Sequence, residues 1–587
     1  RELETAGGDA RGEMYCEPVL SPDGLRAVLD KRHPDIKRPA SAIQVAITES
    51  LIGCGDGIRE TELEEKFGKC RAQILSLEKK GVLRRVMRAA ERARSETVLP
   101  EKPNAEPVRL NDEQSAAFEK LAELSGDGRA HGALLYGVTG SGKTAVMLAL
   151  IDLMLSRGRG VILLLPEIAL TPQSLAIFCS RYGERVAVLH SGLSRSERYA
   201  AWERIRTGAA PLAVGTRSAI FAPVKDPGLI VIDEEQEHTY KSDMSPRYHA
   251  RDVAKFRCTQ HGALLLLGSA TPDVVSRYYA ETGRYHYFTL PDRFNARKLP
   301  DVIIADMKQE LRNGNAGSIS SVLYGELEEN LRRGEQSILF LNRRGSARML
   351  LCGECGYVPQ CPRCSVPMTY HSANERLMCH YCGHSEAVVD RCSECGGLMK
   401  RVGSGTQKVE QELFDLFPKA KVLRMDADTV GASRGHEALL REFEEKKIPI
   451  LLGTQMVAKG LDFENVTLVG VLDADLSLYA QNYHAAERTY SLLAQVVGRA
   501  GRGERPGRAV IQTYHPENEV IQAAAKQDYE TFYQNELRMR SLRRYPPFAD
   551  LFTLTVSGLD ELRVIAAARA LCDALRYACS QPPLKDL

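Results

Sequence analysis

The sequence has no apolar run long enough to cross a bilayer, and no signal-peptide pattern opens it. It also lacks a strong net charge, because 78 Lys and Arg residues are offset by 76 Asp and Glu residues. The overall charge therefore argues neither for nor against a nucleic-acid partner, and only local patches can decide that question. The lack of a long apolar run argues against a membrane-spanning protein.

Fewer than half of the cysteines lack a spacing pattern. Seven of the 15 are scattered along the sequence, and scattered unpaired cysteines are common in proteins of the reducing cytoplasm. The other eight form four Cys-x-x-Cys pairs: Cys352/Cys355, Cys361/Cys364, Cys379/Cys382 and Cys392/Cys395. This spacing lets both thiolates of a tight turn reach one tetrahedral ion, so the segment predicts two zinc sites.

A chain of 587 residues is too long for one hydrophobic core, which predicts three or more domains. Near the N-terminus we expect a helix at Ser41–Leu51 and two more within Thr61–Lys80, with a break near Gly68. Helix, turn and helix, followed by the apolar pair Val82-Leu83, favour a winged-helix domain. A small structural helical domain is the alternative.

Short apolar runs bounded by polar turns predict two successive parallel sheets. The first set of strands is expected at Ala133–Tyr136, Val161–Leu165, Val186–Leu189, Leu212–Val214, Leu229–Ile232 and Leu264–Leu267. The second set is expected at Ser337–Leu341, Lys421–Arg424, Ile450–Leu452, Val466–Val471 and Ala509–Thr513. The simplest architecture is two α/β layers in tandem, with the cysteine pairs inserted after the first strand of the second layer. Beyond Ser541, a strand at Leu551–Val556 and a helix at Glu561–Ala578 indicate an α+β piece.

A glycine-rich segment follows the first predicted strand and opens a predicted helix. Its residues are Gly137, Val138, Thr139, Gly140, Ser141, Gly142, Lys143 and Thr144. In this context the glycines let backbone N–H groups form an anion nest, while Lys143 reaches the β- and γ-phosphates and Thr144 ligates Mg²⁺. The segment therefore predicts binding of a nucleoside triphosphate.

Acids and arginines elsewhere supply the remaining chemistry of phosphoryl transfer. Asp233 and Glu234 end a buried strand, at the sheet edge where ligands of open α/β sheets bind. Asp233 is placed to hold Mg²⁺ and Glu234 to polarise the attacking water, and a solvated acidic cluster is the alternative. Arg499 and Arg502, three residues apart in a predicted helix, are candidate arginine fingers, with local ion pairing as the alternative.

These motifs resemble those of superfamily 2 helicases, and the cysteine pairs narrow the resemblance to the PriA family of primosomal replication-restart helicases (primosomal protein N′). The segments that carry the resemblance are Leu165–Ile168, Val214–Ser218, Asp233–Gln236, Pro246–Asp252, Gly268–Thr271, Leu339–Gly345, Gly453–Phe463 and Gln495–Arg502. The resemblance implies two RecA-like lobes, over residues 108–296 and 297–540, the second with a zinc-binding insert at 350–398. It also implies a winged-helix-like domain and linker over 1–100, and a C-terminal domain over 541–587.

In function, the resemblance implies ATP-driven 3′→5′ translocation on DNA and unwinding at stalled or abandoned replication forks, followed by primosome assembly. The implied cofactors are ATP, Mg²⁺ and two Zn²⁺. The implied partners are forked and single-stranded DNA, primosome and helicase-loader proteins, and single-stranded DNA-binding protein. We expect a cytoplasmic, nucleoid-associated monomer.

The sequence departs from the family pattern at its ends and in the acidic segment. It begins at Arg1 and stops at Leu587, after what resembles half a domain. We therefore expect the family's 3′-end-binding N-terminal domain to be absent and the C-terminal domain to be truncated. Gln236 stands where the family usually has His, and a Gln can still bond across to the second lobe, which leaves hydrolysis possible with altered coupling.

The resemblance also assigns residues to the DNA-binding or coupling face, namely Thr216 and Arg217 in the first lobe and Thr454 and Lys459 in the second. Gln114 is placed to recognise adenine, with an ordinary role at a helix N-terminus as the alternative.

A loop in the first lobe, Tyr240–Arg251, mixes aromatic rings with cations, as stacking on single-stranded bases requires. Tyr240, Arg247 and Tyr248 are its candidate contacts. A loop packed only for structure is the alternative.

Two pairings of the cysteines are open. Nested pairing places Cys352, Cys355, Cys392 and Cys395 on one ion and Cys361, Cys364, Cys379 and Cys382 on the other. It brings the two ends of the insert together, whereas sequential pairing leaves them unclamped. We expect the nested arrangement, which the family resemblance also implies.

Three other functions compete with a DNA helicase. A translocase that moves on duplex DNA without separating the strands has the same motor motifs. The zinc module is also compatible with a partner-docking scaffold, although intact Lys143, Asp233 and Glu234 argue against a chain without catalysis. An RNA helicase is chemically possible, because contacts to the phosphate backbone do not require deoxyribose.

Overall fold

The computed structural model describes residues 13–30, 32–34, 36, 41–52, 57–68, 70–88, 108–167, 172–291, 300–341, 349–363, 367–371, 375–379, 382–402, 405–426, 436–454, 463, 465–479, 482–501 and 505–581. Contacts divide the chain into two compact units. The first comprises Arg1–His131, Thr144–Asp233 and Glu237–Leu266, and the second comprises Gly132–Lys143, Glu234–Gln236 and Leu267–Leu587.

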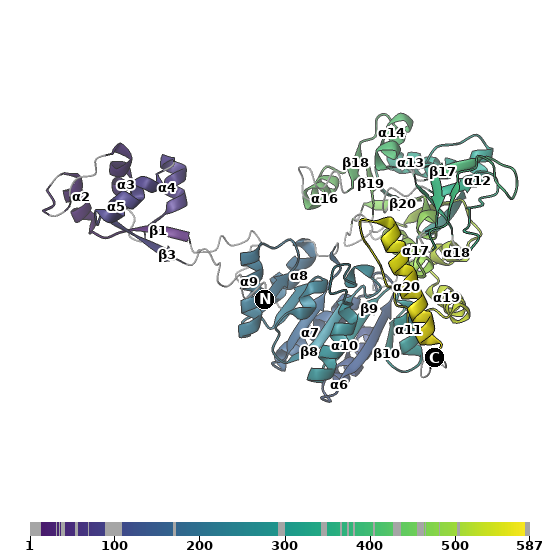
Figure 1. Cartoon of the computed structure of the whole chain (residues 1–587), viewed down its shortest axis with the longest axis horizontal. Helices are drawn as coiled ribbons and strands as arrows, with labels where there is room; N and C mark the ends of the chain where they lie inside the picture. Colours follow the sequence, from purple (N-terminus) through teal and green to yellow (C-terminus); the bar gives the residue numbers. More distant parts are fainter. Residues whose placement is uncertain are drawn as a thin grey trace. The chain divides into compact units, whose positions relative to one another are not determined.

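A small domain near the N-terminus combines helices with a three-stranded antiparallel sheet of order β2-β1-β3 (Figure 1). Its elements are β1 (Glu13–Pro18), α2 (Pro22–Leu29), α3 (Ala42–Ile52), β2 (Ile58–Arg59), α4 (Glu60–Phe67), α5 (Arg71–Lys79) and β3 (Leu83–Arg88). Its core includes Leu25, Ile47, Leu63 and Ile74. Between α4 and α5, Gly68 has a φ of +74°, which explains the predicted break. The arrangement agrees with the winged-helix-like prediction, and β1, β2 and α2 were not predicted.

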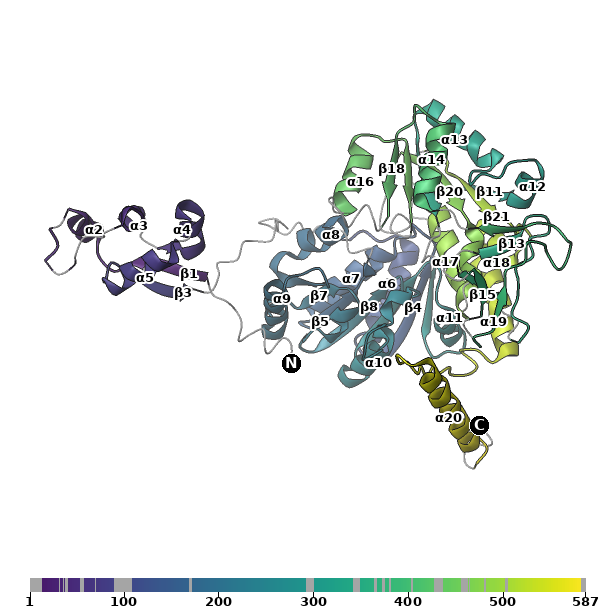
Figure 2. The same cartoon turned by 45° about the horizontal axis from the view of Figure 1, so that its top comes forward.

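The first large sheet has seven strands in the order β10-β4-β9-β8-β5-β7-β6. They are β4 (His131–Gly137), β5 (Gly160–Leu164), β6 (Val186–Leu189), β7 (Leu212–Gly215), β8 (Pro227–Asp233), β9 (Leu264–Ser269) and β10 (His286–Leu290). Four of them, β4, β5, β7 and β8, are labelled in Figure 2. The helices are α6 (Asp112–Leu124), α7 (Lys143–Ser156), α8 (Pro172–Tyr182), α9 (Arg195–Thr207), α10 (Ala250–His261) and α11 (Val274–Glu281). All six predicted strands are confirmed, because their continuous apolar runs are buried. The edge strand β10 was missed, since most of its side chains are partly exposed.

The second large sheet is parallel, with the order β11-β21-β20-β12-β19-β18. Its strands are β11 (Asp301–Asp306), β12 (Gln336–Leu341), β18 (Val422–Met425), β19 (Ile450–Gly453), β20 (Val466–Leu472) and β21 (Arg508–Thr513). The five predicted strands are confirmed. β11 was missed because it is a partly exposed edge strand. Since β11 precedes β12 in the chain, the cysteine insert follows the second strand of this sheet, and its predicted position after the first strand was wrong.

Helices cover both faces of the second sheet. They are α12 (Met307–Arg312), α13 (Ser321–Arg333), α14 (Thr406–Leu416), α16 (His436–Glu445), α17 (Ala485–Val497), α18 (Glu519–Ala525) and α19 (Tyr529–Arg543). Successive residues of β12 alternate between two cores, as the pleat of a strand requires. Ile338 and Phe340 pack with α16 to α19, whereas Leu339 and Leu341 pack with α13 and α14.

The cysteine insert is built from short strands between β12 and α14. β13 (Met349–Cys352) pairs antiparallel with β17 (Met399–Val402). β14 (Thr369–His371), β15 (Arg376–Met378) and β16 (Ser385–Ala387) form a separate small antiparallel sheet. The pairing of β13 with β17 brings the two ends of the insert together.

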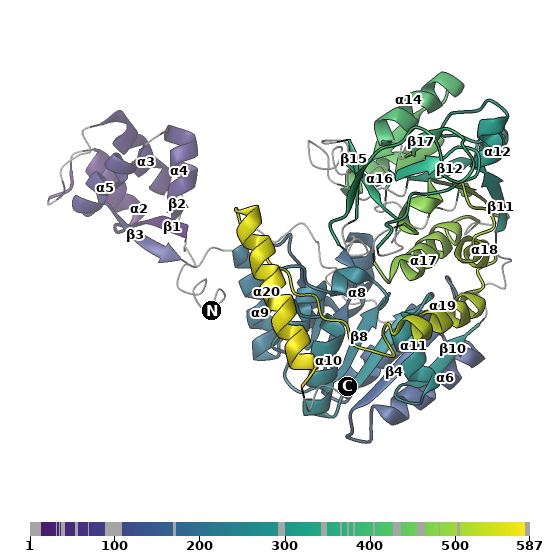
Figure 3. The same cartoon turned by 45° about the vertical axis from the view of Figure 1, so that its right-hand side comes forward.

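The C-terminal segment contains helix α20 (Glu561–Cys579), coloured yellow in Figure 3, which buries none of its residues. The strand predicted at Leu551–Val556 is not formed, although these residues are described. Phe552 and Leu554 are exposed, and no neighbouring strand satisfies the backbone here. In the described part of the chain, no helix is both long and apolar enough to span a membrane.

Candidate functional site

The phosphate-binding segment lies between β4 and α7, as predicted. Gly140 and Gly142 have φ angles of +82° and +83°, which residues with side chains rarely adopt. A Cβ atom at Gly137 would collide with the Oγ of Ser141, so glycine is required there too. The Nζ of Lys143 donates a hydrogen bond to the carbonyl of Gly137 at 2.6 Å. The segment therefore combines glycine turns with an adjacent cation, the arrangement that binds nucleotide phosphates.

Two other predicted nucleotide contacts differ in their surroundings. Thr144 directly follows Lys143 in the first turn of α7. Gln114 is fully buried, and its side-chain oxygen accepts a hydrogen bond from the backbone N–H of Asn111 at 3.1 Å. The side chain of Asn111 accepts one from the N–H of Gln114 at 2.9 Å. This reciprocal capping box supports the helix N-terminal role for Gln114. Adenine recognition by Gln114 stays a prediction.

The acidic segment begins at Asp233, the last residue of β8. Glu234 has a φ of +47°, a left-handed conformation that costs free energy for a residue with a side chain and that clusters at functional sites. Glu235 is buried, and its carboxylate accepts hydrogen bonds from the backbone of Asp273 at 2.8 Å and the hydroxyl of Ser276 at 2.9 Å. Because Glu235 is buried and bonded, the segment is not a solvated acidic cluster.

Two amide groups hold the carboxylate of Glu234. Its Oε2 accepts hydrogen bonds from the Nε2 of Gln236 at 2.7 Å and the Nε2 of Gln495 at 3.2 Å. The Oε1 of Gln236 accepts a hydrogen bond from Ser269 at 2.6 Å. These two contacts of Gln236 both lie within the lobe that carries it. Gln495, which also bonds to Glu234, belongs to α17.

Ser491, one turn before Gln495 on α17, continues the same contact face. Its hydroxyl lies 2.6 Å from the hydroxyl of Thr271. Thr271 belongs to the Gly268–Thr271 segment, which begins within the strand β9 and continues past its end. Sequence reasoning missed both contacts. Only the spacing of four residues between Ser491 and Gln495 hinted that the two side chains share a helix face.

Gly498, at the C-terminal end of α17, packs against the phosphate-binding segment. A Cβ atom at Gly498 would lie 2.9 Å from the Oγ1 of Thr139. This close approach places the next residue, Arg499, near that segment, as an arginine finger requires. The second predicted finger, Arg502, lies outside the described residues.

The first group of cysteines comprises Cys352, Cys355, Cys392 and Cys395, whose sulfur atoms all lie within 4.8 Å of one another. The sulfurs of Cys352 and Cys395 are 3.4 Å apart, and those of Cys355 and Cys392 are 3.6 Å apart. At a tetrahedral zinc with Zn–S distances of about 2.3 Å, sulfurs are about 3.8 Å apart. The donor set therefore fits zinc. This grouping is the one that nested pairing predicts for the outer four cysteines.

The second group contains Cys361, Cys379 and Cys382. The sulfurs of Cys361 and Cys382 are 3.6 Å apart. Cys364, the predicted fourth ligand, lies outside the described residues. These three thiols come from the inner pairs, as nested pairing predicts.

A repeated turn positions the thiols. Gly356, Gly383 and Gly396 each follow the second cysteine of a pair and have φ angles of +79°, +71° and +73°. Their N–H groups donate to the carbonyls of the first cysteines at 3.0, 2.9 and 3.0 Å. Burial opposes ionisation of Cys352, but the backbone N–H groups of Cys355 and Glu354 lower the pKa of its thiol to about 7. Burial raises the pKa of the neighbouring Cys355 thiol to about 12, so in the absence of a metal the group favours a thiolate at Cys352 with Cys355 protonated.

Two of the residues predicted to contact DNA, Tyr240 and Arg217, make hydrogen bonds that hold the loop at residues 240–251 in place. Tyr240 is buried, and its hydroxyl donates to the carbonyls of Leu164 at 3.1 Å and Asp233 at 2.7 Å. The guanidinium of Arg217 donates to the carbonyls of Thr239 at 2.8 Å and Lys241 at 2.6 Å. Tyr240 therefore offers no open ring face for base stacking, and its predicted stacking role lacks support. Arg217 anchors the loop.

A pocket of about 370 Å³ lies beside this loop. Its lining includes His190, Trp202, Thr216, Arg217, Phe221 and Tyr248. The rings of Phe221 and Tyr248 meet edge to face, with centroids 4.8 Å apart. Trp202 is the single tryptophan of the chain. Aromatic rings with nearby cations are the surroundings in which proteins stack single-stranded bases.

The other candidates for DNA contact have simpler surroundings. Arg247, next to Tyr248, is exposed, whereas Thr216 is buried at the end of β7. Thr454 is half-buried and directly follows β19. Lys459 lies outside the described residues.

Comparison with known families assigns three parts of the chain. The DEAD/DEAH box helicase family matches residues 111–278, and the helicase conserved C-terminal domain matches residues 401–504. Between them, the Cys-rich region domain of PriA DNA helicase matches residues 361–386. The first match contains the phosphate-binding and acidic segments, and the last contains Gln495 and Arg499.

Curated relatives match nearly the whole chain. The replication restart protein PriA of Bacillus subtilis is 46% identical over 554 residues, which is 94% of this chain and 68% of the relative. PriA of Synechocystis sp. is 42% identical, covering 86% of this chain and 61% of the relative. PriA of Haemophilus influenzae is 39% identical, with 75% and 60% covered. The chain thus spans about two thirds or less of the length of these relatives.

A solved structure of RecG bound to a three-way DNA junction is also similar to this chain. It is 16% identical and has a TM-score of 0.45, covering 79% of this chain and 51% of its own. This similarity is too low to carry an argument about function.

Proposed function

This chain belongs to the PriA family of replication restart DNA helicases, which are ATP-dependent, and we propose that it unwinds DNA in the 3′→5′ direction at stalled or abandoned forks. The observation that carries the proposal is the contact of Gln495 with Glu234. This hydrogen bond joins the helix that carries Arg499 to the acid expected to polarise water. A motor needs such a link, because hydrolysis must be coupled to movement of the two lobes.

We assign the chemistry to residues around the phosphate-binding segment. Lys143 neutralises the β- and γ-phosphates, while Thr144 and Asp233 hold Mg²⁺. Glu234 orients the attacking water, and Arg499, assisted by Arg502, stabilises the charge of the transition state. The bound Mg²⁺ supplies further charge neutralisation.

We propose that single-stranded DNA crosses the pocket beside the loop at residues 240–251. Tyr248 and Trp202 stack with bases, and the exposed Arg247 contacts phosphate. Arg217 and Tyr240 act indirectly by fixing the loop. Thr216, Thr454 and Lys459 complete the path as contacts to the sugar–phosphate backbone.

For the insert, we propose one Zn²⁺ in each cysteine group. The free energy of binding both ions stabilises the folded state of this module, which is too small to have a large core. We further propose that this module serves strand separation and the docking of helicase-loader and other primosome proteins, and that single-stranded DNA-binding protein is a partner. The chain is proposed to act as a monomer that associates with the nucleoid.

The decisive experiment measures ATP turnover without nucleic acid and with single-stranded, duplex and forked DNA. We expect strong stimulation by single-stranded and forked DNA, and loss of nucleotide binding and turnover in Lys143→Ala. Glu234→Gln is expected to keep nucleotide binding and lose turnover. Near wild-type turnover in Lys143→Ala would refute the assignment of the phosphate site.

Strand displacement and triplex displacement assays separate a helicase from a duplex translocase. Displacement of the third strand of a triplex, without separation of a forked duplex, would support the translocase. Stimulation by RNA equal to that by DNA would support an RNA helicase.

The fluorescence of Trp202 reports on the proposed DNA path, because it is the single tryptophan. We expect quenching by an oligothymidylate and much weaker quenching by an abasic oligomer of equal length and charge. Equal quenching by both would show that no base stacks in this pocket.

A further inference from the structure

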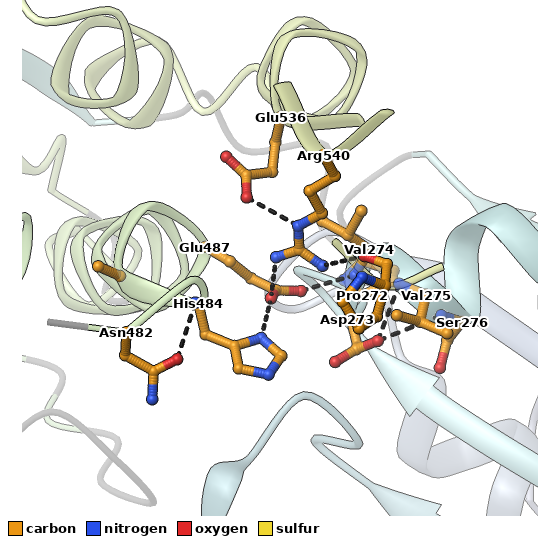
Figure 4. Close-up of polar contacts among 12 residues, drawn as sticks. Pro272, Asp273, Val274, Val275, Ser276, Asn482, His484, Glu487, Glu536 and Arg540 are labelled. Atoms are coloured by element: carbon orange, nitrogen blue, oxygen red, sulfur yellow. Dashed lines mark hydrogen bonds and ion pairs between the residues drawn. The ribbon is translucent and has the colours of Figure 1, made fainter. Parts of the chain in front are cut away.

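A buried ion pair joins helices α17 and α19, outside the residues proposed to contact nucleotide. The guanidinium of Arg540 donates to the Oε2 of Glu487 at 2.8 Å (Figure 4). Arg540 is 1% exposed and Glu487 is 6% exposed, so water screens the pair very little. On α19 itself, Glu536 accepts a second hydrogen bond from Arg540 at 2.8 Å. A buried guanidinium with two carboxylates specifies one arrangement of these helices.

The same carboxylate of Glu487 binds a third element. Its Oε1 accepts a hydrogen bond from the backbone N–H of Val274 at 2.6 Å. Val274 is the first residue of α11, three residues after Thr271. His484 lies 2.8 Å from the Oε2 of Glu487 through its Nδ1. Burial by itself raises the pKa of Glu487, but Arg540 and His484 lower it far below the usual carboxyl range, so the negative charge persists.

α19 is fastened to α11 by further contacts. The hydroxyl of Tyr529 donates to the carbonyl of Pro272 at 2.9 Å, and the hydroxyl of Tyr533 donates to Glu281 at 2.5 Å. The guanidinium of Arg277 lies 4.9 Å from the centre of the Tyr533 ring. Since α19 holds α11 along its length, the pair of Glu487 and Arg540 connects α17 to a rigid support.

Glu487 lies on the same face of α17 as the two residues that contact Thr271 and Glu234. Ser491 and Gln495 follow it at intervals of four residues, so the three side chains lie on one face of the helix. This face contacts, in turn, the N-terminus of α11, Thr271 and Glu234. A rotation or slide of α17 would break the last of these contacts and displace Arg499.

We propose that Glu487, held by Arg540, is a positioning residue for ATP hydrolysis. It fixes the rotation of α17 about its axis and its position along that axis. As a result, Gln495 orients Glu234, and Gly498 brings Arg499 to the phosphate-binding segment. The inference rests on the proposed function, in that hydrolysis occurs at this segment. It adds a residue that touches neither nucleotide nor DNA and acts through α17.

The test compares Glu487→Gln with Glu536→Gln in the full chain. Both variants remove one carboxylate charge from Arg540, but Glu536 pairs with Arg540 within α19, whereas Glu487 reaches α11. We expect Glu487→Gln to lower kcat for ATP roughly tenfold, because a displacement of a fraction of an ångström at the reacting groups has such an effect. The KM for ATP should stay within about twofold, since Lys143 is untouched. Glu536→Gln should keep near wild-type kcat.

A triple variant, Glu487→Leu with Arg540→Met and Glu536→Gln, removes the guanidinium together with both of its carboxylates, and it decides the question if Glu487→Gln does not fold. We expect it to fold and to show the same loss of kcat. A folded variant lacking the pair of Glu487 and Arg540 with wild-type kcat would overturn the proposal, as would an equal loss in Glu536→Gln. Each result is a ratio to wild-type turnover, measured with and without DNA. Absence of DNA stimulation in the wild type would therefore count against the proposed function without altering this ratio.

Discussion

Substituting Gly498 by Ala should disturb catalysis while leaving the fold intact. The backbone at Gly498 has φ −63° and ψ −5°, which alanine adopts without strain. Alanine is also favoured over glycine in helices, by up to about 1 kcal/mol. The free energy of unfolding is therefore expected to stay the same or rise slightly.

The added methyl group meets the phosphate-binding segment. It would lie 2.9 Å from the Oγ1 of Thr139, about 0.5 Å closer than an ordinary van der Waals contact. Either Thr139 or the end of α17, with Arg499, must move by about that distance. Because a misplacement of about 1 Å can cost a hundredfold in rate, half of it predicts about a tenfold loss of kcat, or about 1.4 kcal/mol in the barrier.

The assay is steady-state ATP hydrolysis with saturating single-stranded DNA, together with thermal unfolding. Gly325→Ala is the matched control, because a Cβ atom at Gly325 of α13 would meet nothing within 4 Å. Thr139→Ala removes the colliding atoms, so Gly498→Ala combined with Thr139→Ala should turn over ATP as fast as Thr139→Ala alone. Wild-type turnover in Gly498→Ala would refute the argument. So would a loss that Thr139→Ala does not relieve.

Three further outcomes are expected. Metal analysis of reduced protein should find two Zn²⁺ per chain, and Cys352→Ser combined with Cys392→Ser should remove one of them, whereas loss of both or neither would contradict nested pairing. Arg499→Ala should lower ATP turnover by about 10³-fold or more with little change in ATP affinity, and near-normal turnover would mark it as a local structural cation. The pKa of Glu487 is depressed by Arg540 against the effect of burial, so the pair stabilises the fold above the usual carboxyl pKa of about 4.3 and loses this contribution as the pH falls further. Denaturation at several pH values should therefore show Glu487→Gln less stable than wild type at pH 7, with a difference that shrinks in acid, and a constant difference would contradict this.

The local motifs could be predicted from the sequence by itself. The phosphate-binding segment is contiguous, and its glycines and Lys143 are required by backbone geometry within that segment alone. Buried parallel strands have continuous apolar runs, so the central strands of both sheets were predicted. Three of the Cys-x-x-Cys turns lie in the described part of the chain and each closes through a backbone hydrogen bond, which makes the spacing informative. The edge strands β10 and β11 are short and most of their side chains are partly or fully exposed, so they lack the continuous apolar run that marks the central strands.

The contacts between segments far apart in the sequence were decided by the tertiary structure. Nothing within the acidic segment predicts that Glu234 is held by Gln495, or that Gln236 bonds to Ser269. Tyr240 has an aromatic ring of the kind that stacks on bases. Its hydroxyl, however, donates to two backbone carbonyls and its ring is buried in the core. A side chain's type limits the partners that it can take, but only the packing of helices and strands places one partner within hydrogen-bond distance and excludes the others.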